Sequence, residues 1–181
     1  MHKDIQAVLI TQKDIERRVK ELGVEISGNY PLDADLIMVC ILRGAVIFMA
    51  DLARQIEQVV AFDFMDVCSY GSSVESSGVV RIIKDLEEDI TNRHVLIVED
   101  IIDTGTTLKY VLDILKTRNP LSIEVVTLLD KPDRRLEKKV NVDYNGFSIP
   151  DKFVVGYGLD YAQRFRNLPY IAVLKPEAYS I

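Results

Sequence analysis

Three acidic residues and a run of threonines stand close together in the middle of the chain, and their spacing suits phosphate and metal chemistry. Glu99 and Asp100 are adjacent, and Asp103 follows after two apolar residues and leads into Thr104-Gly105-Thr106-Thr107. The run 94–98 before the acids is apolar from Val95 onward and is typical of a short buried strand. Apolar residues at helical spacing follow the threonines: Leu108, Val111, Leu112 and Leu115. The sequence therefore predicts a strand, an acidic loop and a helix in succession.

The two halves of this loop offer different chemistry. The second half provides backbone N–H groups near Gly105 and three threonine hydroxyls at a helix start, where the helix dipole favours a phosphate. The first half provides two carboxylates, which a phosphate alone would repel. A ligand that carries a phosphate, hydroxyl groups and a hard cation such as Mg²⁺ explains both halves.

A structural interpretation of the same residues is also open. Asp103 could cap the helix, and Glu99 and Asp100 could form a solvated strand end. The combined pattern favours a ligand site over structure alone. Sites of the ATP or dinucleotide type lose their main support, because neither G-x-x-x-x-G-K-[ST] nor G-x-G-x-x-G after a strand occurs. An aspartic protease would need two Asp-Thr-Gly copies, and this chain has one.

The elements that must position these residues alternate between strand-like and helix-like patterns, which predicts an α/β domain with a mainly parallel sheet. Thr11 and Asp14 predict a helix start, and the apolar stripe that follows is expected to end at Gly23. Asn145-Gly146, between alternating apolar residues, predicts a hairpin. Further strands are predicted at 36–41, 60–68, 79–86 and 123–129, with short apolar runs at 153–157 and 170–174.

Composition narrows the class of protein. The 181 residues suffice for one domain with a substantial core. No apolar run is long enough to cross a membrane and no secretory signal opens the chain, so we expect a cytoplasmic protein without membrane contact. The net charge of −6 disfavours nucleic-acid binding. Two cysteines and two histidines make a disulfide framework and a zinc site unexpected.

The segment 95–107 closely resembles the phosphoribosyl pyrophosphate motif of type I phosphoribosyltransferases. The resemblance covers nearly the whole chain, from Leu42-Arg43-Gly44 to Asp160 and Arg166, and its later segments indicate a 6-oxopurine base. It implies one domain over 1–181: a mainly parallel twisted sheet flanked by helices, with a small flap (hood) over the carboxyl ends of the strands. The hood is expected from the N-terminal segment and about 131–181.

The resemblance also implies roles for the acidic loop in moving a phosphoribosyl group from pyrophosphate to a purine. Glu99 and Asp100 are expected to hold the ribose hydroxyls, directly or through Mg²⁺, and Thr104, Gly105, Thr106 and Thr107 to bind the 5′-phosphate. Asp103 matches the general base, which deals with the proton on purine N7 while N9 attacks the sugar.

Pyrophosphate and metal contacts follow from the same resemblance. A cis peptide is expected between Leu42 and Arg43, with the backbone amides of Arg43 and Gly44 facing the pyrophosphate. Arg166 is expected to contact the pyrophosphate, and Asp160 to bind a second Mg²⁺. A mobile lid is expected at 69–78, beginning with Ser69 and Tyr70.

The base is expected to meet a further group of residues: Lys131, Lys152, Phe153, Val154 and Asp160. Lys131 would donate to purine O6, and a donor-only side chain favours a carbonyl over the amino group of adenine. Phe153 would stack on the ring, and the backbone near Val154 would read its edge.

We therefore expect a Mg²⁺-dependent enzyme of purine salvage that uses hypoxanthine or guanine, without ranking the two, and forms a homodimer or homotetramer. A xanthine or pyrimidine phosphoribosyltransferase stays open, although Lys131 and the Phe153 segment disfavour it. A different class, a regulatory RNA- or DNA-binding protein with this fold, is opposed by Asp103 and by the net charge of −6.

Overall fold

The computed structural model of the protein describes residues 2–69, 80–137 and 140–179. The expected lid, including Tyr70, lies outside the described residues except for Ser69, whose backbone ends a strand. The strands are β1 (Ile5–Ile10), β2 (Leu36–Leu42), β3 (Val60–Ser69), β4 (Val80–Lys84), β5 (His94–Ile102), β6 (Ser122–Asp130), β7 (Tyr144–Ser148), β8 (Val154–Val155) and β9 (Ile171–Leu174). The helices are α1 (Gln12–Asn29), α2 (Val46–Ala53) and α3 (Thr106–Lys116), with 3₁₀ turns η1 (Pro132–Arg134) and η2 (Pro176–Ala178).

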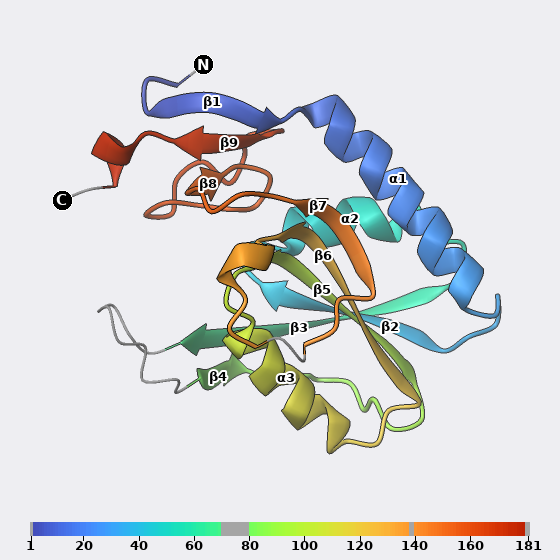
Figure 1. Cartoon of the computed structure of the whole chain (residues 1–181). Helices are drawn as coiled ribbons and strands as arrows, with labels where there is room; N and C mark the ends of the chain where they lie inside the picture. Colours follow the sequence, from blue (N-terminus) through green and yellow to red (C-terminus); the bar gives the residue numbers. More distant parts are fainter. Residues whose placement is uncertain (1, 70–79, 138–139, 180–181) are drawn as a thin grey trace.

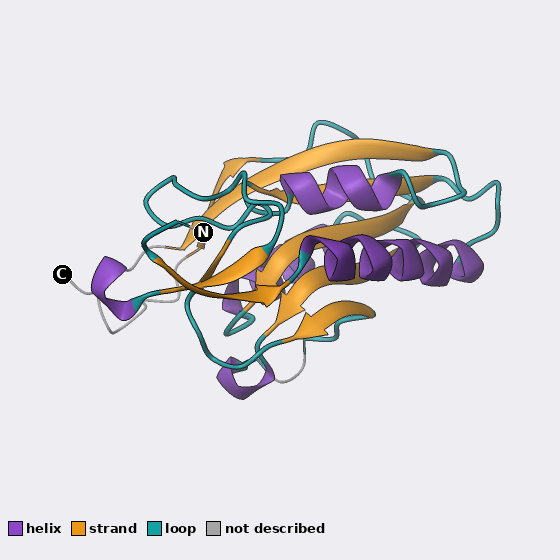
Figure 2. Cartoon of the chain, turned by 90° about the horizontal axis from the view of Figure 1, so that it is seen from above, coloured by secondary structure: helices purple, strands orange, loops and turns teal. Residues whose placement is uncertain are grey.

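A six-stranded sheet of order β4-β3-β2-β5-β6-β7 forms the body of the molecule. Its neighbouring strands run parallel except for the pair β3 and β4. Helices α1 and α2 lie side by side on one face, and α3 lies on the other (Figures 1 and 2). The predicted α/β fold with a mainly parallel sheet is confirmed. Because helices cover both faces, the central strand β2 is apolar throughout.

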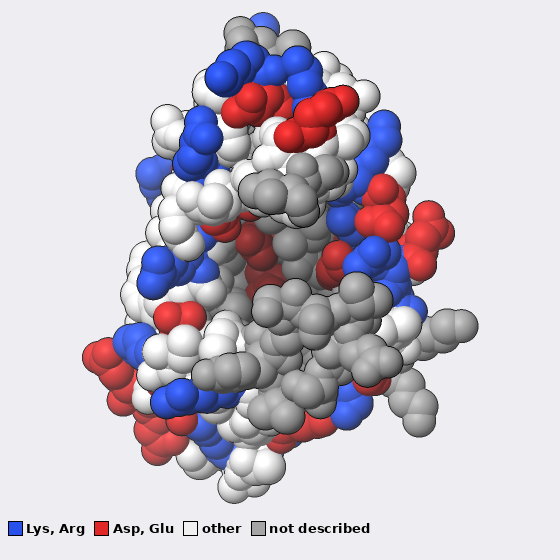
Figure 3. All heavy atoms as spheres, turned by 90° about the vertical axis from the view of Figure 1, so that its left-hand side faces the viewer, with Lys and Arg blue, Asp and Glu red and all other residues white. Residues whose placement is uncertain are grey.

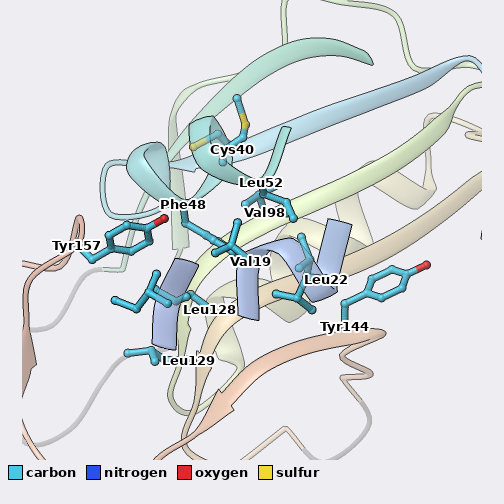
Figure 4. Packing of buried hydrophobic residues seen from close by; sticks show 14 of the residues in the cluster. Val19, Leu22, Cys40, Phe48, Leu52, Val98, Leu128, Leu129, Tyr144 and Tyr157 are labelled. Atoms are coloured by element: carbon cyan, nitrogen blue, oxygen red, sulfur yellow. The ribbon is translucent and has the colours of Figure 1, made fainter. Parts of the chain in front are cut away.

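The core has one layer on each face of this sheet. Successive side chains of a strand point to opposite faces, so Cys40 of β2 joins the layer under α1 and α2, and Val39 joins the layer under α3. Figure 4 shows the first layer, in which side chains of α1 and α2 pack on the strands: Val19, Leu22, Phe48, Leu52, Cys40, Val98 and Leu128. These layers hold the carboxyl ends of β2, β5 and β6 at fixed positions.

Helix α1 begins as predicted and ends later than predicted. The Thr11 side chain caps it by accepting a hydrogen bond from the Asp14 N–H at 3.2 Å. The predicted end at Gly23 is wrong, because the helix continues to Asn29. Gly23 is instead a packing position, where a Cβ atom would come within 2.4 Å of the Gln55 Cβ.

The predicted hairpin at Asn145-Gly146 is also wrong. Both residues lie within β7, which pairs in parallel with β6. A Cβ on Gly146 would lie 2.3 Å from the Leu128 carbonyl oxygen, so this glycine permits close approach of the backbones rather than a turn. The guanidinium of Arg18 on α1 donates to the carbonyls of Asn145 and Gly146 at 2.8 and 3.2 Å.

A second sheet, of order β1-β9-β8, lies beside the carboxyl ends of the large sheet (Figure 1). Both of its pairings are antiparallel. The expected hood range of about 131–181 includes β7, which the structure places in the large sheet. In the part of the chain that the structure describes, no helix combines the length and the apolar character needed to cross a membrane.

Candidate active site

A turn suited to phosphate lies where β5 gives way to α3. Strand β5 reaches Ile102, so Glu99 and Asp100 lie near the end of a strand and not in a loop. Gly105 is the N-cap of α3 with φ 82° and ψ −4°, a left-handed conformation that glycine adopts without strain. Asp103 is thus not the helix cap. A helix leaves its first N–H groups without helical partners, and a cavity of about 190 Å³ lies at this helix start, lined by Glu99, Asp103, Thr104, Gly105 and Thr107 among others.

Glu99 and Asp100 form a crowded acidic pair. Glu99 Oε2 is fully buried and has no hydrogen-bond partner among the described residues, whereas Asp100 Oδ1 accepts from the Ile101 N–H at 2.7 Å. Burial raises the pKa of both carboxyls, and the charge of Asp100 raises that of Glu99 further. The pair is suited to a ligand that brings a cation or hydroxyl donors.

Gly44 brings the loop after β2 against the acidic pair. The peptide bond between Leu42 and Arg43 is cis, as the resemblance implied, and the Arg43 side chain is exposed. A Cβ on Gly44 would lie 1.5 Å from Asp100 Oδ2. A Cβ on Gly158, where φ is 105°, would lie 1.9 Å from the Gly44 carbonyl oxygen. Three segments far apart in the sequence therefore touch here, and only glycines allow it.

Asp160 and Arg166 belong to the loop that carries Gly158. Arg166 pairs with Asp160 Oδ1 at 2.8 Å and donates to the Gly158 carbonyl at 2.7 Å. The pKa of Asp100, raised chiefly by burial, also responds to the charges of Arg166 and Asp160, so these groups lie near it. Within the described ranges, no three or more His, Cys, Asp or Glu side chains form a group that could hold a metal ion. The predicted ligands Glu99, Asp100 and Asp160 thus do not enclose an ion by themselves.

Four charged side chains form a ring at the carboxyl end of β6, and we call Asp103, Lys131, Arg134 and Asp151 the charge ring. Lys131 is buried, and its Nζ lies 3.2 Å from Asp151 Oδ1 and 3.8 Å from Asp103 Oδ2. Arg134 lies 2.8 Å from Asp103 Oδ1 through Nε and 3.3 Å from Asp151 Oδ2 through an Nη atom. The hydrogen bond from Lys131 is the main cause of the lowered pKa of Asp151.

A cavity of about 560 Å³ adjoins the charge ring, which is large enough for a purine. Besides the ring, it is lined by residues of the segment 151–153 and of the small sheet and C-terminal turn: Gln6, Lys152, Phe153, Val173, Leu174, Pro176 and Tyr179. Phe153 is 38% exposed, and its ring stacks on that of Tyr179 with the centroids 4.8 Å apart. Val154 is buried in β8, so its backbone rather than its side chain can face a ligand.

Asp103 lines both cavities, so the turn at the start of α3 and the cavity beside Phe153 meet at this residue. Figure 3 shows a hollow with an acidic floor on this side of the molecule. A ligand with a phosphate at one end and a ring at the other could therefore occupy both cavities at once and lie alongside Asp103.

Among the lining residues that were not predicted, Arg134, Asp151 and Tyr179 contact the predicted residues Asp103, Lys131 and Phe153. Arg134 follows Lys131 by three positions after a proline, and this spacing could have suggested a tight turn that brings both cations together. Asp151 directly precedes the predicted Lys152-Phe153 pair. Tyr179 carried no sequence signal, because its stacking depends on where the C-terminal segment lies.

Comparisons with known proteins agree with this geometry. Residues 8–162 match the family model described as "Phosphoribosyl transferase domain". The chain is 51% identical over 179 residues to the hypoxanthine-guanine phosphoribosyltransferase of Bacillus subtilis (strain 168), covering 99% of this chain and 98% of that protein. A crystal structure of a hypoxanthine phosphoribosyltransferase from Staphylococcus aureus has a TM-score of 0.95 at 51% identity, covering 100% of this chain and 97% of the other.

A more distant structure is similar over the same length. The hypoxanthine phosphoribosyltransferase from Trypanosoma cruzi, a mutant in a ternary substrates complex, has a TM-score of 0.90 at 39% identity, with coverage of 99% and 100%. Because the family model matches residues 8–162 and relatives of nearly equal length are 51% identical, the chain belongs to the phosphoribosyltransferase family.

Proposed function

We propose that this chain is an enzyme of purine salvage that moves the 5-phosphoribosyl group from phosphoribosyl pyrophosphate to N9 of hypoxanthine or guanine, giving IMP or GMP and pyrophosphate. One observation carries the proposal: two cavities meet at Asp103, one at a helix start and the other beside a buried lysine and an exposed aromatic ring. These features match the phosphate and the base of a purine nucleotide. A relative of nearly equal length, 51% identical, bears the name of this activity.

At the sugar end, Thr104–Thr107 bind the 5′-phosphate through the N–H groups and hydroxyls of the helix start. Glu99 and Asp100 hold the ribose hydroxyls. Their negative charge also stabilises the cationic sugar that develops when the bond from C1′ to pyrophosphate breaks.

At the base end, Lys131 donates a hydrogen bond to O6 and Asp103 faces N7. Purine N9 forms the new bond to C1′, pyrophosphate leaves with the electrons of the old bond, and the N7 proton passes to Asp103. Phe153, held flat by Tyr179, supplies an apolar wall for the ring. Lys152 lines the same cavity and helps to hold the nucleotide.

At the leaving-group end, the pyrophosphate is bound by the backbone of Arg43 and Gly44 and by the guanidinium of Arg166. Asp160, paired with Arg166 at 2.8 Å, lies at the same place. A cation beside a departing polyanion stabilises it directly.

The donor set also fits Mg²⁺. Glu99 Oε2 is buried without a partner among the described residues, which is costly unless a ligand satisfies it. Mg²⁺ is commonly held by one or two carboxylates together with substrate phosphates, which agrees with carboxylates that do not enclose an ion alone. We assign Glu99 and Asp100 to one ion and Asp160 to a second. When bound, Mg²⁺ neutralises charge on the departing pyrophosphate.

The test is a panel of bases incubated with phosphoribosyl pyrophosphate and Mg²⁺, followed by chromatography of the nucleotides. We expect hypoxanthine and guanine to be consumed, and adenine and uracil to remain. Adenine turnover would overturn the role of Lys131, because a lysine cannot accept a hydrogen bond from an amino group. Xanthine measures how far the pocket discriminates at the 2-position.

The partners that we propose are these small molecules and a second copy of the chain, as a homodimer or homotetramer in the cytoplasm. The edge strand β4 and its neighbour β3 expose Ile83 and Phe62, at 61% and 48%, which supports contact between copies. Light scattering during gel filtration measures the assembly. In a gel-shift assay we expect the protein to bind neither RNA nor DNA, in line with its net charge of −6.

A further inference from the structure

The segment that follows Lys131 is docked against the phosphate turn. The N–H groups of Leu136 and Glu137 both donate to the Thr104 carbonyl at 3.1 Å. A Cβ on Gly105 would lie 3.3 Å from the Glu137 Cβ, so the two backbones are in close contact. The position of η1 relative to Asp103 is therefore set by main-chain contacts and does not depend on the side chains at its tip.

Arg134 stands at that tip and reaches Asp103 directly. Its Nε donates to Asp103 Oδ1 at 2.8 Å, while the other carboxylate oxygen, Oδ2, lies 3.8 Å from Lys131 Nζ. One carboxylate oxygen of Asp103, the proposed general base, thus accepts a short hydrogen bond from Arg134. The other lies on the side of the buried lysine that we assign to purine O6.

The energetics argue against a mainly structural purpose for this contact. The side chains of Asp103 and Arg134 are 39% and 47% exposed, and exposed ion pairs contribute little to the stability of a fold. A guanidinium offers several donors in a fixed plane, so it can orient a carboxylate in a way that a flexible ammonium cannot. The contact is better suited to directing a side chain than to holding the chain together.

We propose that Arg134 is a positioning residue for Asp103, an inference that rests on the function proposed above. By holding Oδ1, it directs Oδ2 toward N7 of a base whose O6 is bound by Lys131. Arg134 contributes to transfer only through Asp103.

The test is a double-mutant cycle with Arg134→Met and Asp103→Asn, in which kcat, both KM values and the melting temperature are measured. Arg134→Met should lower kcat about tenfold, because misorientation of a catalytic group by fractions of an ångström has effects of this size. KM for phosphoribosyl pyrophosphate should stay within about twofold. Arg134→Lys should restore little of kcat, because an ammonium keeps the charge but not the fixed plane of donors. In the Asp103→Asn background, Arg134→Met should change kcat by less than about twofold.

The matched control is Arg17→Met on α1, which removes another exposed arginine that pairs with an aspartate, Asp14, at 3.0 Å. It should leave every kinetic constant unchanged. An equal loss of kcat from Arg134→Met in both backgrounds, an unchanged or faster rate, or a loss explained by melting would overturn the proposal. If Asp103→Asn alone leaves kcat intact, the assignment of Asp103 fails instead, and the two failures are distinguishable.

Discussion

Replacing Gly44 by alanine tests whether the site depends on close contact between the loop after β2 and the acidic pair, Glu99 and Asp100. The added Cβ would lie 1.5 Å from Asp100 Oδ2 and 2.5 Å from its Cγ. The carboxylate must move by about 1.5 Å to reach the shortest distance that real Cβ atoms show, and such a misplacement can cost about a hundredfold in rate. We expect kcat/KM for phosphoribosyl pyrophosphate to fall by about two orders of magnitude. Because the added atom overfills a packed contact, the free energy of unfolding should fall by about 1–3 kcal/mol.

The matched control for this variant is Gly28→Ala. Gly28 lies on the exposed side of α1, and nothing lies within 4 Å of a Cβ built there. Alanine in a helix should stabilise the fold by about 0.5–1 kcal/mol and leave the kinetics alone. In a chain that already carries Asp100→Ala, adding Gly44→Ala should lower the rate little further, because the clashing atoms are gone. If Gly44→Ala by itself retained normal kcat/KM, the contact would have no functional role and the reasoning would be refuted.

Two other predictions concern the support of the site and its electrostatics. The hydroxyl of Tyr157 donates to Asp51 Oδ2 at 2.5 Å and so connects the loop of Asp160 to α2. Tyr157→Phe should therefore raise KM for phosphoribosyl pyrophosphate about threefold or more and leave KM for the base unchanged. Equal changes in both KM values would contradict this. Burial, and then the charge of Asp100, raises the pKa of Glu99 above the ordinary value of 4.5. Between the pKa of Glu99 in the unfolded state and its higher pKa in the folded state, the folded state binds more protons, so the free energy of unfolding falls as the pH rises. Without divalent cations, Glu99→Gln should therefore melt above the wild type at pH 8 and lose this advantage near pH 4, and a pH-independent difference would refute the argument.

Much of the fold was predictable because its signals are local. The alternation of apolar strands with amphipathic helices reports burial on both faces of a sheet, and the cap at Thr11 depends on a residue three positions away. The predictions from glycine were wrong at two positions where the glycine is needed for a tertiary contact. Gly23 faces Gln55 and Gly146 faces Leu128, and neither neighbour is close in sequence. From the sequence alone, a glycine indicates a helix end or a turn. Its role in close packing becomes clear only when the segment that lies against it in the fold is known.

The candidate site divides along the same line. The turn at the start of α3 is contiguous in sequence, so its residues could be named from their order. The charge ring joins residues from three segments of the chain. Lys131 was predicted through resemblance alone. Arg134 and Asp151 could not be assigned a role from the sequence, because an arginine or aspartate next to a strand is usually solvated. The spacing of Arg134 from Lys131 indicates a tight turn, and only the distances to Asp103 and Lys131 show the contacts.

The carboxylates of this cleft fall into two electrostatic groups, and the difference makes a prediction about metal dependence. Asp103 and Asp151 are already paired with Lys131 and Arg134, whereas burial raises the pKa of Glu99 and Asp100. Pyrophosphate adds negative charge next to the second group, so it should raise the melting temperature only when Mg²⁺ accompanies it. GMP should raise the melting temperature with or without Mg²⁺, because we expect its phosphate to bind at the start of α3 and its base to bind in the cavity beside Lys131. The measurement is thermal unfolding with each ligand, with and without a chelator. If pyrophosphate stabilised the chelated protein as strongly as the Mg²⁺-loaded one, the acidic pair would not be the group that receives the cation.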